Sequence, residues 1–229
     1  MNEQPAPTCQ AVIFDLDGVI TDTARLHFLA WKRLADRESI PFDEQFNERL
    51  KGVDRLGSLE LILSQSARTY AAADKVAMAE EKNVYYRQLV AGMTPDDLLP
   101  GALSALDSVR AAGLKTGLAS VSKNASTVLD RLGIAERFDY AVDAGDVAKG
   151  KPDPEIFLLA AHRLSAEPAR CIGVEDAFAG IQSIKAAGMF AVGIGEPTVL
   201  RKADLVIPGL LAFNIAEVLR KAGLSSPRS

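Results

Sequence analysis

The sequence has 229 residues, of which 48% are hydrophobic and 24% charged, so it can bury a sizeable core and is not a disordered chain. Lysine and arginine number 26 against 30 aspartates and glutamates, which gives a net charge of −4 at pH 7. This balance excludes the broad basic surface that binds nucleic acid or anionic lipid. We therefore expect neither a nucleic-acid nor a membrane partner.

The first ten residues are polar and lack the basic start and long apolar core of a secretion signal. No later segment approaches the roughly 18 uncharged apolar residues that a membrane span needs. The two cysteines, Cys9 and Cys171, lie in unrelated sequence contexts, which is typical of a reducing compartment. These features predict a cytoplasmic protein, and we expect it to act as a monomer.

Short apolar, β-branched runs alternate with helical patterns, and after residue 100 their spacing is that of βαβ units. Val12, Ile13 and Phe14 form a continuous apolar run, as in a strand covered by helices on both faces. The fold class predicted is therefore α/β, with a Rossmann-like parallel sheet. Its strands are expected at residues 11–15, 115–119, 140–142, 171–174, 190–194 and 205–207.

About a hundred residues separate the first two predicted strands, far more than one crossover helix requires. This stretch predicts four helices, at residues 22–37, 43–50, 55–66 and 73–90. Glycines and prolines near residues 18 and 92–101 indicate two flexible connections. We predict a core domain of residues 1–20 and 95–229, with an inserted helical cap domain of residues 21–94.

Ligands of open α/β sheets bind beyond the carboxyl ends of the strands, so the residues that follow each strand are candidates for the site. The first strand is followed by Asp15, Leu16, Asp17 and Gly18. Side chains two residues apart on an extended segment share a side, so one carboxylate could be a nucleophile and the other an acid or base. Taken alone, this motif is more often a simple turn.

The residues that follow three further strands favour a functional site over a simple turn. Ser120 to Asn124 follow the second strand at a helix start, where backbone N–H groups can accept an anion, or where a serine simply caps the helix. Lys151 offers a cation that could shield a carboxylate from a phosphate, although it could also be a solvated loop residue. Glu175 and Asp176 are hard oxygen ligands suited to Mg²⁺, or an ordinary acidic surface pair. Together the four strand ends predict a phosphotransfer centre.

The four motifs after successive strands, in this order along the chain, resemble those of the haloacid dehalogenase superfamily. The helical insert is similar to the α-helical C1 cap of that superfamily. The resemblance extends over nearly the whole chain. Within the superfamily, several strings resemble the β-phosphoglucomutases: residues 15–23, His27, Trp31, residues 45–48, residues 50–53, Lys82 with Asn83, and residues 118–124. Val121 differs from the family, in which a smaller residue is usual at this position.

The resemblance implies a role for each core motif. Asp15 would be the nucleophile that becomes an aspartyl phosphate, and Asp17 the general acid and base for the sugar hydroxyl. Ser120 and Lys151 would hold the transferring phosphoryl group. Mg²⁺ would be bound by Asp15, the backbone carbonyl of Asp17 and Asp176, with Glu175 beside it.

In the cap, the resemblance implies that Arg55 grips the phosphate that is not reacting, with help from Ser122, Lys123 and Asn124 of the core. The other residues that the resemblance assigns to substrate binding are Thr23, His27, Trp31, Lys51, Gly52, Ser58, Lys82, Asn83 and Val121. Without the resemblance, His27 and Trp31 could merely pack on one helix face, and Lys51 and Arg55 could form a solvated cationic stripe.

The implied reaction interconverts β-D-glucose 1-phosphate and D-glucose 6-phosphate through an aspartyl-phosphate enzyme, with β-D-glucose 1,6-bisphosphate as the priming donor. Its partners are small sugar phosphates. A sugar-phosphate phosphatase on the same scaffold is the main alternative, because only the group that attacks the aspartyl phosphate differs. A non-catalytic phosphosugar-binding protein is a third, although simple binding does not require Asp15, Asp17, Lys151 and Asp176 together.

Overall fold

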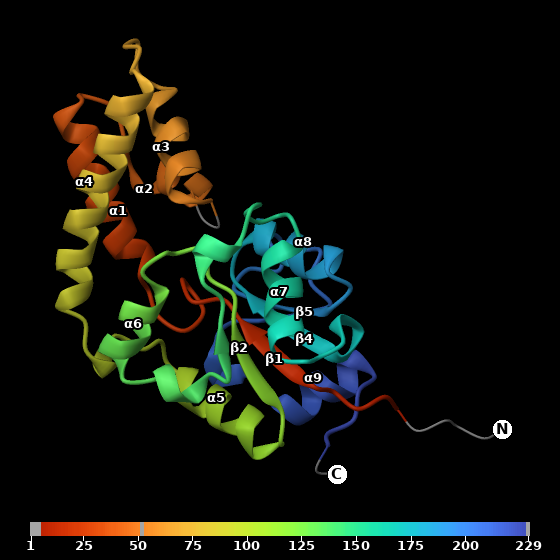
Figure 1. Cartoon of the computed structure of the whole chain (residues 1–229). Coiled ribbons are helices and arrows are strands. Elements are labelled where there is room, and N and C mark those ends of the chain that lie inside the picture. Colours follow the sequence, from red (N-terminus) through yellow and green to blue (C-terminus); the bar gives the residue numbers. More distant parts are fainter. Residues whose placement is uncertain (1–5, 51–52, 228–229) are drawn as a thin grey trace.

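The computed structural model describes residues 6–50 and 53–227, and these form a parallel sheet flanked by helices, with a helical insert beside it (Figure 1). The six strands of the described chain run in the order β3-β2-β1-β4-β5-β6. All neighbouring pairs are parallel, with Phe14 opposite both Leu118 and Val174. The strands are β1 (Ala11–Phe14), β2 (Lys115–Leu118), β3 (Tyr140–Ala141), β4 (Cys171–Glu175), β5 (Phe190–Ile194) and β6 (Leu205–Ile207). The predicted fold class is confirmed.

Helices cover both faces of the sheet, which explains the continuous apolar sequence of its central strand. Val12 and Phe14 pack in one core cluster with α5, α6 and α9, whereas Ala11 and Ile13 pack in a second cluster with α7 and α8. Successive side chains of a strand point to opposite faces, so every position of β1 must be apolar. These helices are α5 (Ala102–Ala111), α6 (Ala125–Leu132), α7 (Glu155–Arg163), α8 (Phe178–Ala186) and α9 (Ile215–Ala222).

The insert between β1 and β2 has its own apolar cluster, which includes Trp31, Leu34, Leu59, Ile62 and Met78. Its helices are α1 (Ala24–Arg37), α2 (Glu44–Asn47), α3 (Arg55–Leu63) and α4 (Ala72–Ala91). Within the described residues, no helix has both the length and the apolar character of a membrane span. The inserted helical domain is thus present as predicted, and its exact limits at residues 20/21 and 94/95 stay a prediction.

Short 3₁₀ turns complete the described chain, and two predicted helix ends are wrong. The helix predicted to reach Leu50 ends at Asn47 and continues as a 3₁₀ turn. We expected the third helix of the insert to reach Ser66, but α3 ends at Leu63. The Ser64 hydroxyl donates to the carbonyl of Leu61, and the amides of Gln65 and Ser66 bond three residues back, which tightens the last turn and stops the helix. The 3₁₀ turns are η1 (Glu48–Leu50), η2 (Pro95–Asp97), η3 (Ala135–Arg137), η4 (Ala144–Asp146), η5 (Pro168–Arg170) and η6 (Leu210–Ala212).

The two segments that join the insert to the sheet run side by side. The Thr21 hydroxyl donates to the carbonyl of Asp97 at 2.7 Å, and the amide of Leu99 donates to the carbonyl of Ile20 at 2.9 Å. Tyr86 and Val90 of α4 also pack in the core cluster that contains Ile20. The chain therefore leaves and re-enters the core at one place, next to the strand end that carries Asp15.

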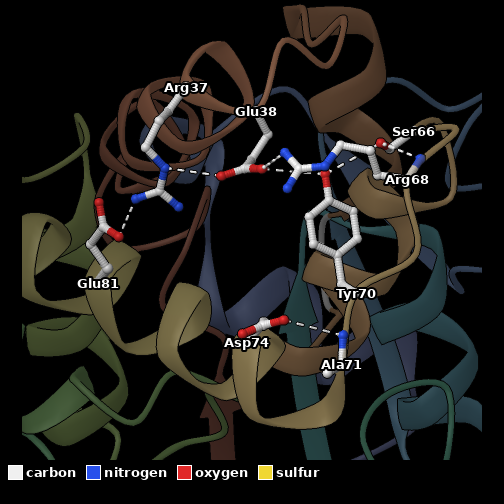
Figure 2. Close-up of polar contacts among 8 residues, drawn as sticks. All are labelled: Arg37, Glu38, Ser66, Arg68, Tyr70, Ala71, Asp74 and Glu81. Atoms are coloured by element: carbon white, nitrogen blue, oxygen red, sulfur yellow. Dashed lines mark hydrogen bonds and ion pairs between the residues drawn. The ribbon is translucent and has the colours of Figure 1, made fainter.

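At the far end of the insert, Glu38 connects α1 to the segment between α3 and α4 (Figure 2). Its carboxylate accepts from Arg68 at 2.9 Å, from the Tyr70 hydroxyl at 3.3 Å and from Arg37 at 3.1 Å. Arg37 also pairs with Glu81 of α4. Only 13% of the Glu38 side chain is exposed, whereas Arg37 and Arg68 are exposed donors, so its removal costs a half-buried acceptor that orders Tyr70 and the two arginines around it.

We predict that Glu38→Ala lowers the free energy of unfolding by about 2 kcal/mol, as expected for hydrogen bonds to a charged group. Glu60→Ala is the matched control, because Glu60 pairs with Lys75 at 2.8 Å but its side chain is 57% exposed. Exposed pairs of this kind contribute less than about 1 kcal/mol. Urea denaturation of both variants measures the difference, and equal losses would show that Glu38 has no special role in the insert.

Candidate active site

Two acidic side chains contact a buried lysine at the ends of β1 and β4. Asp15 follows β1, and Glu175 is the last residue of β4, the neighbouring parallel strand. The Lys151 ammonium donates to Asp15 Oδ1 at 2.6 Å and to Glu175 Oε2 at 2.7 Å. All three side chains are buried. Lys151 thus holds together two acids that are 160 residues apart in the sequence.

Burial and mutual repulsion set the protonation of this group. Burial, with repulsion from Glu175, raises the pKa of Asp15 to about 6 even though Lys151 opposes the change. The pKa of Glu175 is raised chiefly by burial as well. Burial by itself disfavours the charged form of Lys151, but Asp15 and Glu175 outweigh it and hold the pKa of the lysine above its ordinary value. The site therefore carries more buried negative charge than its lysine neutralises.

Asp17 has a pKa that suits proton transfer near neutral pH. Burial raises its pKa to about 7, with a further contribution from the charge of Asp15. Its Oδ1 is buried and accepts no hydrogen bond from any described residue. A carboxyl group that titrates near neutral pH can both give and take a proton under physiological conditions.

Gly18 is required by the close approach of the two strand ends. Its φ of +81° is favourable only for glycine, and a Cβ at this position would lie 2.2 Å from Oδ2 of Asp176. The glycine of the Asp-x-Asp-Gly motif therefore allows Asp176 to reach the side of Asp15. This contact joins the first and fourth sequence motifs into one site.

The acidic group fits a magnesium ion. Asp15, Glu175 and Asp176 each offer one oxygen, and these atoms lie within 4.8 Å of one another. Carboxylate oxygens are the ligands that Mg²⁺ prefers in proteins. The raised pKa values and the unpaired Oδ1 of Asp17 indicate a local deficit of positive charge, which a divalent cation would offset.

These acids form the floor of a cavity of about 620 Å³ that lies between the insert and the sheet. Asp15, Asp17, Lys151, Glu175 and Asp176 line it from the core. Ten other predicted residues line it too, namely His27, Trp31, Arg55, Ser58, Lys82, Asn83, Val121, Ser122, Lys123 and Asn124. The structure therefore brings most of the sequence-predicted site together in one place.

Two predicted residues that the structure describes are not part of this lining. Ser120 and Thr23 are fully buried, and neither is among the described residues that line the cavity. The Ser120 hydroxyl instead accepts from the amide of Ser122 at 3.1 Å, so it shapes the loop that reaches the cavity. Lys51 and Gly52 lie outside the described residues.

On the insert side, a cluster of cationic and aromatic groups faces the acids. The Lys82 ammonium lies 2.9 Å from Nδ1 of His27 and above the rings of Trp31 and Tyr86, at 4.5 and 4.7 Å from their centroids. Burial and the charge of Arg55 lower the pKa of Lys82 to about 7, and burial beside Lys82 keeps the pKa of His27 well below its ordinary range. His27 is thus a neutral partner of Lys82 at neutral pH.

A hydrogen bond joins the insert to the core beside the cavity, and a helix cap within the insert fixes the position of Arg55. Asn124, at the start of α6, donates from its side-chain amide to Oδ1 of Asn83 at 3.0 Å. Arg55 is the first residue of α3, where the Asp54 carboxylate accepts from the amides of Leu56 and Gly57 and caps the helix. Arg55 therefore enters the cavity from a fixed helix end.

Sequence reasoning missed several residues of the lining. On the insert these include Asn47, Val53, Asp54, Leu56, Val76 and Glu80, and on the core Ala144, Gly145, Val147, Ala148 and Gly150. The core group lies in the loop between β3 and Lys151, and its nearness to Lys151 in the sequence was a usable signal. The signal for Glu80 was its i, i+3 spacing from Asn83 on one helix. Tyr86 was also missed, since buried packing residues carry no motif.

The sequence model of the haloacid dehalogenase-like hydrolases matches residues 9–188. The chain belongs to this family. The relatives of this chain include proteins of two activities, a mutase and a phosphatase. A β-phosphoglucomutase of Bacillus subtilis (strain 168) is 52% identical over 200 residues, which cover 86% of this chain and 88% of the relative. A phosphorylated carbohydrates phosphatase of Thermotoga maritima is 33% identical over 183 residues, which cover 79% and 82%.

Solved structures of this haloacid dehalogenase-like family agree with the sequence relatives. The crystal structure of a β-phosphoglucomutase from Clostridium difficile matches with a TM-score of 0.91 and 46% identity, over 94% of this chain and 97% of that one. The match extends over core and insert together. The resemblance to the β-phosphoglucomutases that the sequence motifs indicated is therefore confirmed.

We predict that Mg²⁺ stabilises the protein more at pH 8 than at pH 5. The pKa values of Asp15 and Asp17 are about 6 and 7 in the folded protein against an ordinary 3.8, so the folded state keeps protons that the unfolded chain releases. The free energy of unfolding then falls as pH rises from about 4 to about 7, and Mg²⁺ competes with these protons.

Thermal unfolding with and without Mg²⁺ measures this effect. We expect the midpoint to rise by about 3 °C or more at pH 8, which corresponds to about 1 kcal/mol for a chain of this size, and by less at pH 5. Asp176→Asn should remove most of the rise. An equal rise at both pH values, or in the variant, would show that the ion binds elsewhere.

Proposed function

We propose that the chain is a β-phosphoglucomutase that interconverts β-D-glucose 1-phosphate and D-glucose 6-phosphate. One observation carries the proposal: Asp15 with Lys151 lies at one side of the cavity, and the guanidinium of Arg55, which has a single 3.4 Å contact with Glu80, lines the same cavity from the insert. A sugar bisphosphate needs such a site, because one phosphate must react while the other is held. The similarity to β-phosphoglucomutases over most of the chain supports the same activity.

Asp15 is the proposed nucleophile. A carboxylate oxygen of Asp15 attacks the phosphorus, and the bond between phosphorus and the sugar oxygen breaks. The Lys151 ammonium, 2.6 Å from Asp15, offsets repulsion between the carboxylate and the incoming phosphate. Mg²⁺ would be held by Asp15, the backbone carbonyl of Asp17 and Asp176, with Glu175 beside it, and supplies further neutralisation of the phosphoryl charge.

Asp17 transfers the proton in each half-reaction. It protonates the sugar oxygen that leaves when Asp15 is phosphorylated, and it takes the proton of the hydroxyl that later attacks the aspartyl phosphate. Its pKa of about 7 suits both directions. Water in place of the sugar hydroxyl would give a phosphatase, so the residues that hold the sugar decide the outcome.

The remaining site residues hold the substrate. Arg55 with Ser122, Lys123 and Asn124 binds the distal phosphate, since a guanidinium can make two parallel bonds to phosphate oxygens. His27, Trp31, Ser58, Lys82 and Asn83 line the sugar side from the insert, and Val121 lines it from the core. We propose that the insert is a cap that closes over the bound sugar and excludes water.

A reaction of this kind needs a phosphorylated enzyme at the start, and we propose β-D-glucose 1,6-bisphosphate as the priming donor. Sugar phosphates are the only partners that the proposal requires. The cytoplasmic location and monomeric state expected from the sequence stay predictions. A phosphatase remains the main alternative because a relative with that activity is 33% identical over 183 residues. A binding protein would not need a nucleophile and its acid-base partner in one cavity.

The deciding experiment incubates the protein with Mg²⁺, β-glucose 1-phosphate and a trace of β-glucose 1,6-bisphosphate, and measures glucose 6-phosphate against free phosphate. We predict glucose 6-phosphate as the main product. Asp15→Asn should lower turnover at least about a hundredfold, or about 2.7 kcal/mol of barrier, because no other group can replace the nucleophile. Free phosphate as the main product would make the protein a phosphatase, and no product would favour a binding protein.

Arg55→Ala should separate the two phosphate sites. We predict a loss of about 1.5 to 3 kcal/mol in mutase turnover, the cost of one charge-assisted contact, with unchanged phosphorylation of Asp15 by acetyl phosphate. Arg49→Ala is the matched control, since Arg49 lies on the ring of Phe46 and is not among the described residues that line the cavity. Equal loss of both reactions in Arg55→Ala would contradict a distal phosphate site.

A further inference from the structure

A carboxylate lies beside the proposed phosphate-binding arginine. Glu80 on α4 lines the cavity, and its Oε2 is 3.4 Å from Nη1 of Arg55. The side chain of Glu80 is 59% exposed and that of Arg55 is 24% exposed. Asp54 is adjacent in sequence, but its carboxylate accepts two amides of its own helix. Glu80 is therefore the acid that shares Arg55 with an incoming phosphate.

A second ion pair joins the same two helices without entering the cavity. Lys75 of α4 contacts both carboxylate oxygens of Glu60 of α3 at 2.8 Å. Neither Glu60 nor Lys75 is among the described residues that line the cavity. The Glu60–Lys75 pair already joins α3 to α4, at a shorter distance than the Arg55–Glu80 pair. The weaker pair at Arg55 is therefore not needed to hold these helices together.

A phosphate bound to Arg55 must compete with Glu80 in two ways. The carboxylate occupies hydrogen-bonding capacity of the guanidinium, and its charge repels the phosphate across a short distance. Both effects lower the affinity of Arg55 for an anion. The pair has a single contact at 3.4 Å, so a phosphate can displace Glu80 from Arg55 without breaking a buried interaction.

We propose that Glu80 competes with the distal phosphate for Arg55 and so limits how tightly and how long this phosphate is held. The inference rests on the proposed function, in which each end of a sugar bisphosphate binds at Arg55 in turn. The bisphosphate must leave Arg55 before it can bind in the opposite orientation. A carboxylate that rebinds the arginine lowers the barrier to this release.

Glu80→Gln tests the proposal, with Glu60→Gln as the matched control at the same helix pair. Binding of β-glucose 1,6-bisphosphate is measured in an Asp15→Asn background, where the nucleophile is removed and turnover is expected to be too slow to interfere. Trp31, the single tryptophan of the sequence, lines the cavity and serves as the fluorescence reporter of binding and release. We expect Glu80→Gln to tighten binding about three- to tenfold, mainly through slower release, and Glu60→Gln to change it less than about twofold.

A second background shows whether the effect acts through Arg55. In Arg55→Ala, the addition of Glu80→Gln should tighten binding less than about twofold, because the competition no longer exists. Unchanged or weaker binding in Glu80→Gln with Arg55 intact would overturn the proposal and make Glu80 a support for the arginine. Equal tightening with and without Arg55 would overturn it too, because general repulsion would then explain the effect.

The outcome is separable from that of the proposed function. Tighter binding in Glu80→Gln, together with free phosphate as the main product of the wild-type enzyme, would keep the competition and remove the mutase activity. Mutase turnover by the wild-type enzyme, with no change of bisphosphate binding in Glu80→Gln, would keep the mutase activity and remove the competition. Each result therefore tests one of the two claims.

Discussion

The buried contact of one lysine with two acids is the constraint on which the site depends. Isolated buried charges are costly, so Lys151, Asp15 and Glu175 are stable in the interior only as a group. The carboxylates lie at the ends of β1 and β4 and the ammonium in the loop between β3 and α7, so the group forms only when the sheet has its parallel order. The charge that stays uncompensated is also the source of reactivity, because it keeps the acids ready for a cation and a phosphoryl group.

The same arrangement explains why an insert follows the first strand. In the proposed reaction the strand ends provide the nucleophile, but they leave it open to water on the side that faces away from the sheet. The insert begins a few residues after Asp17, and its helices place Lys82 and Arg55 over the acids across one cavity. Reaction at Asp15 and selection of the attacking group are therefore assigned to different parts of the chain, and the residues that differ between mutases and phosphatases are expected on the insert.

Much of this could be predicted from the sequence, because strand ends and buried strands have strong local patterns. The apolar run at Val12 to Phe14 indicated a strand with two covered faces, and the motifs at Asp15, Lys151 and Asp176 meet as expected. Pairings across the fold have no such pattern. The contact of Arg55 with Glu80 depends on the packing of two helices, and the burial of Ser120 depends on the path of its loop, so neither could be foreseen.

The central claim is that the phosphoryl group is carried by Asp15, and chemical trapping tests it most directly. An acyl phosphate is reduced by borohydride to an alcohol, which converts an aspartyl phosphate to homoserine at the modified position. The protein is incubated with Mg²⁺ and β-glucose 1,6-bisphosphate, quenched, reduced and sequenced by mass spectrometry. We predict homoserine at position 15. Homoserine at position 17, or an unmodified chain from an enzyme that is turning over, would contradict it.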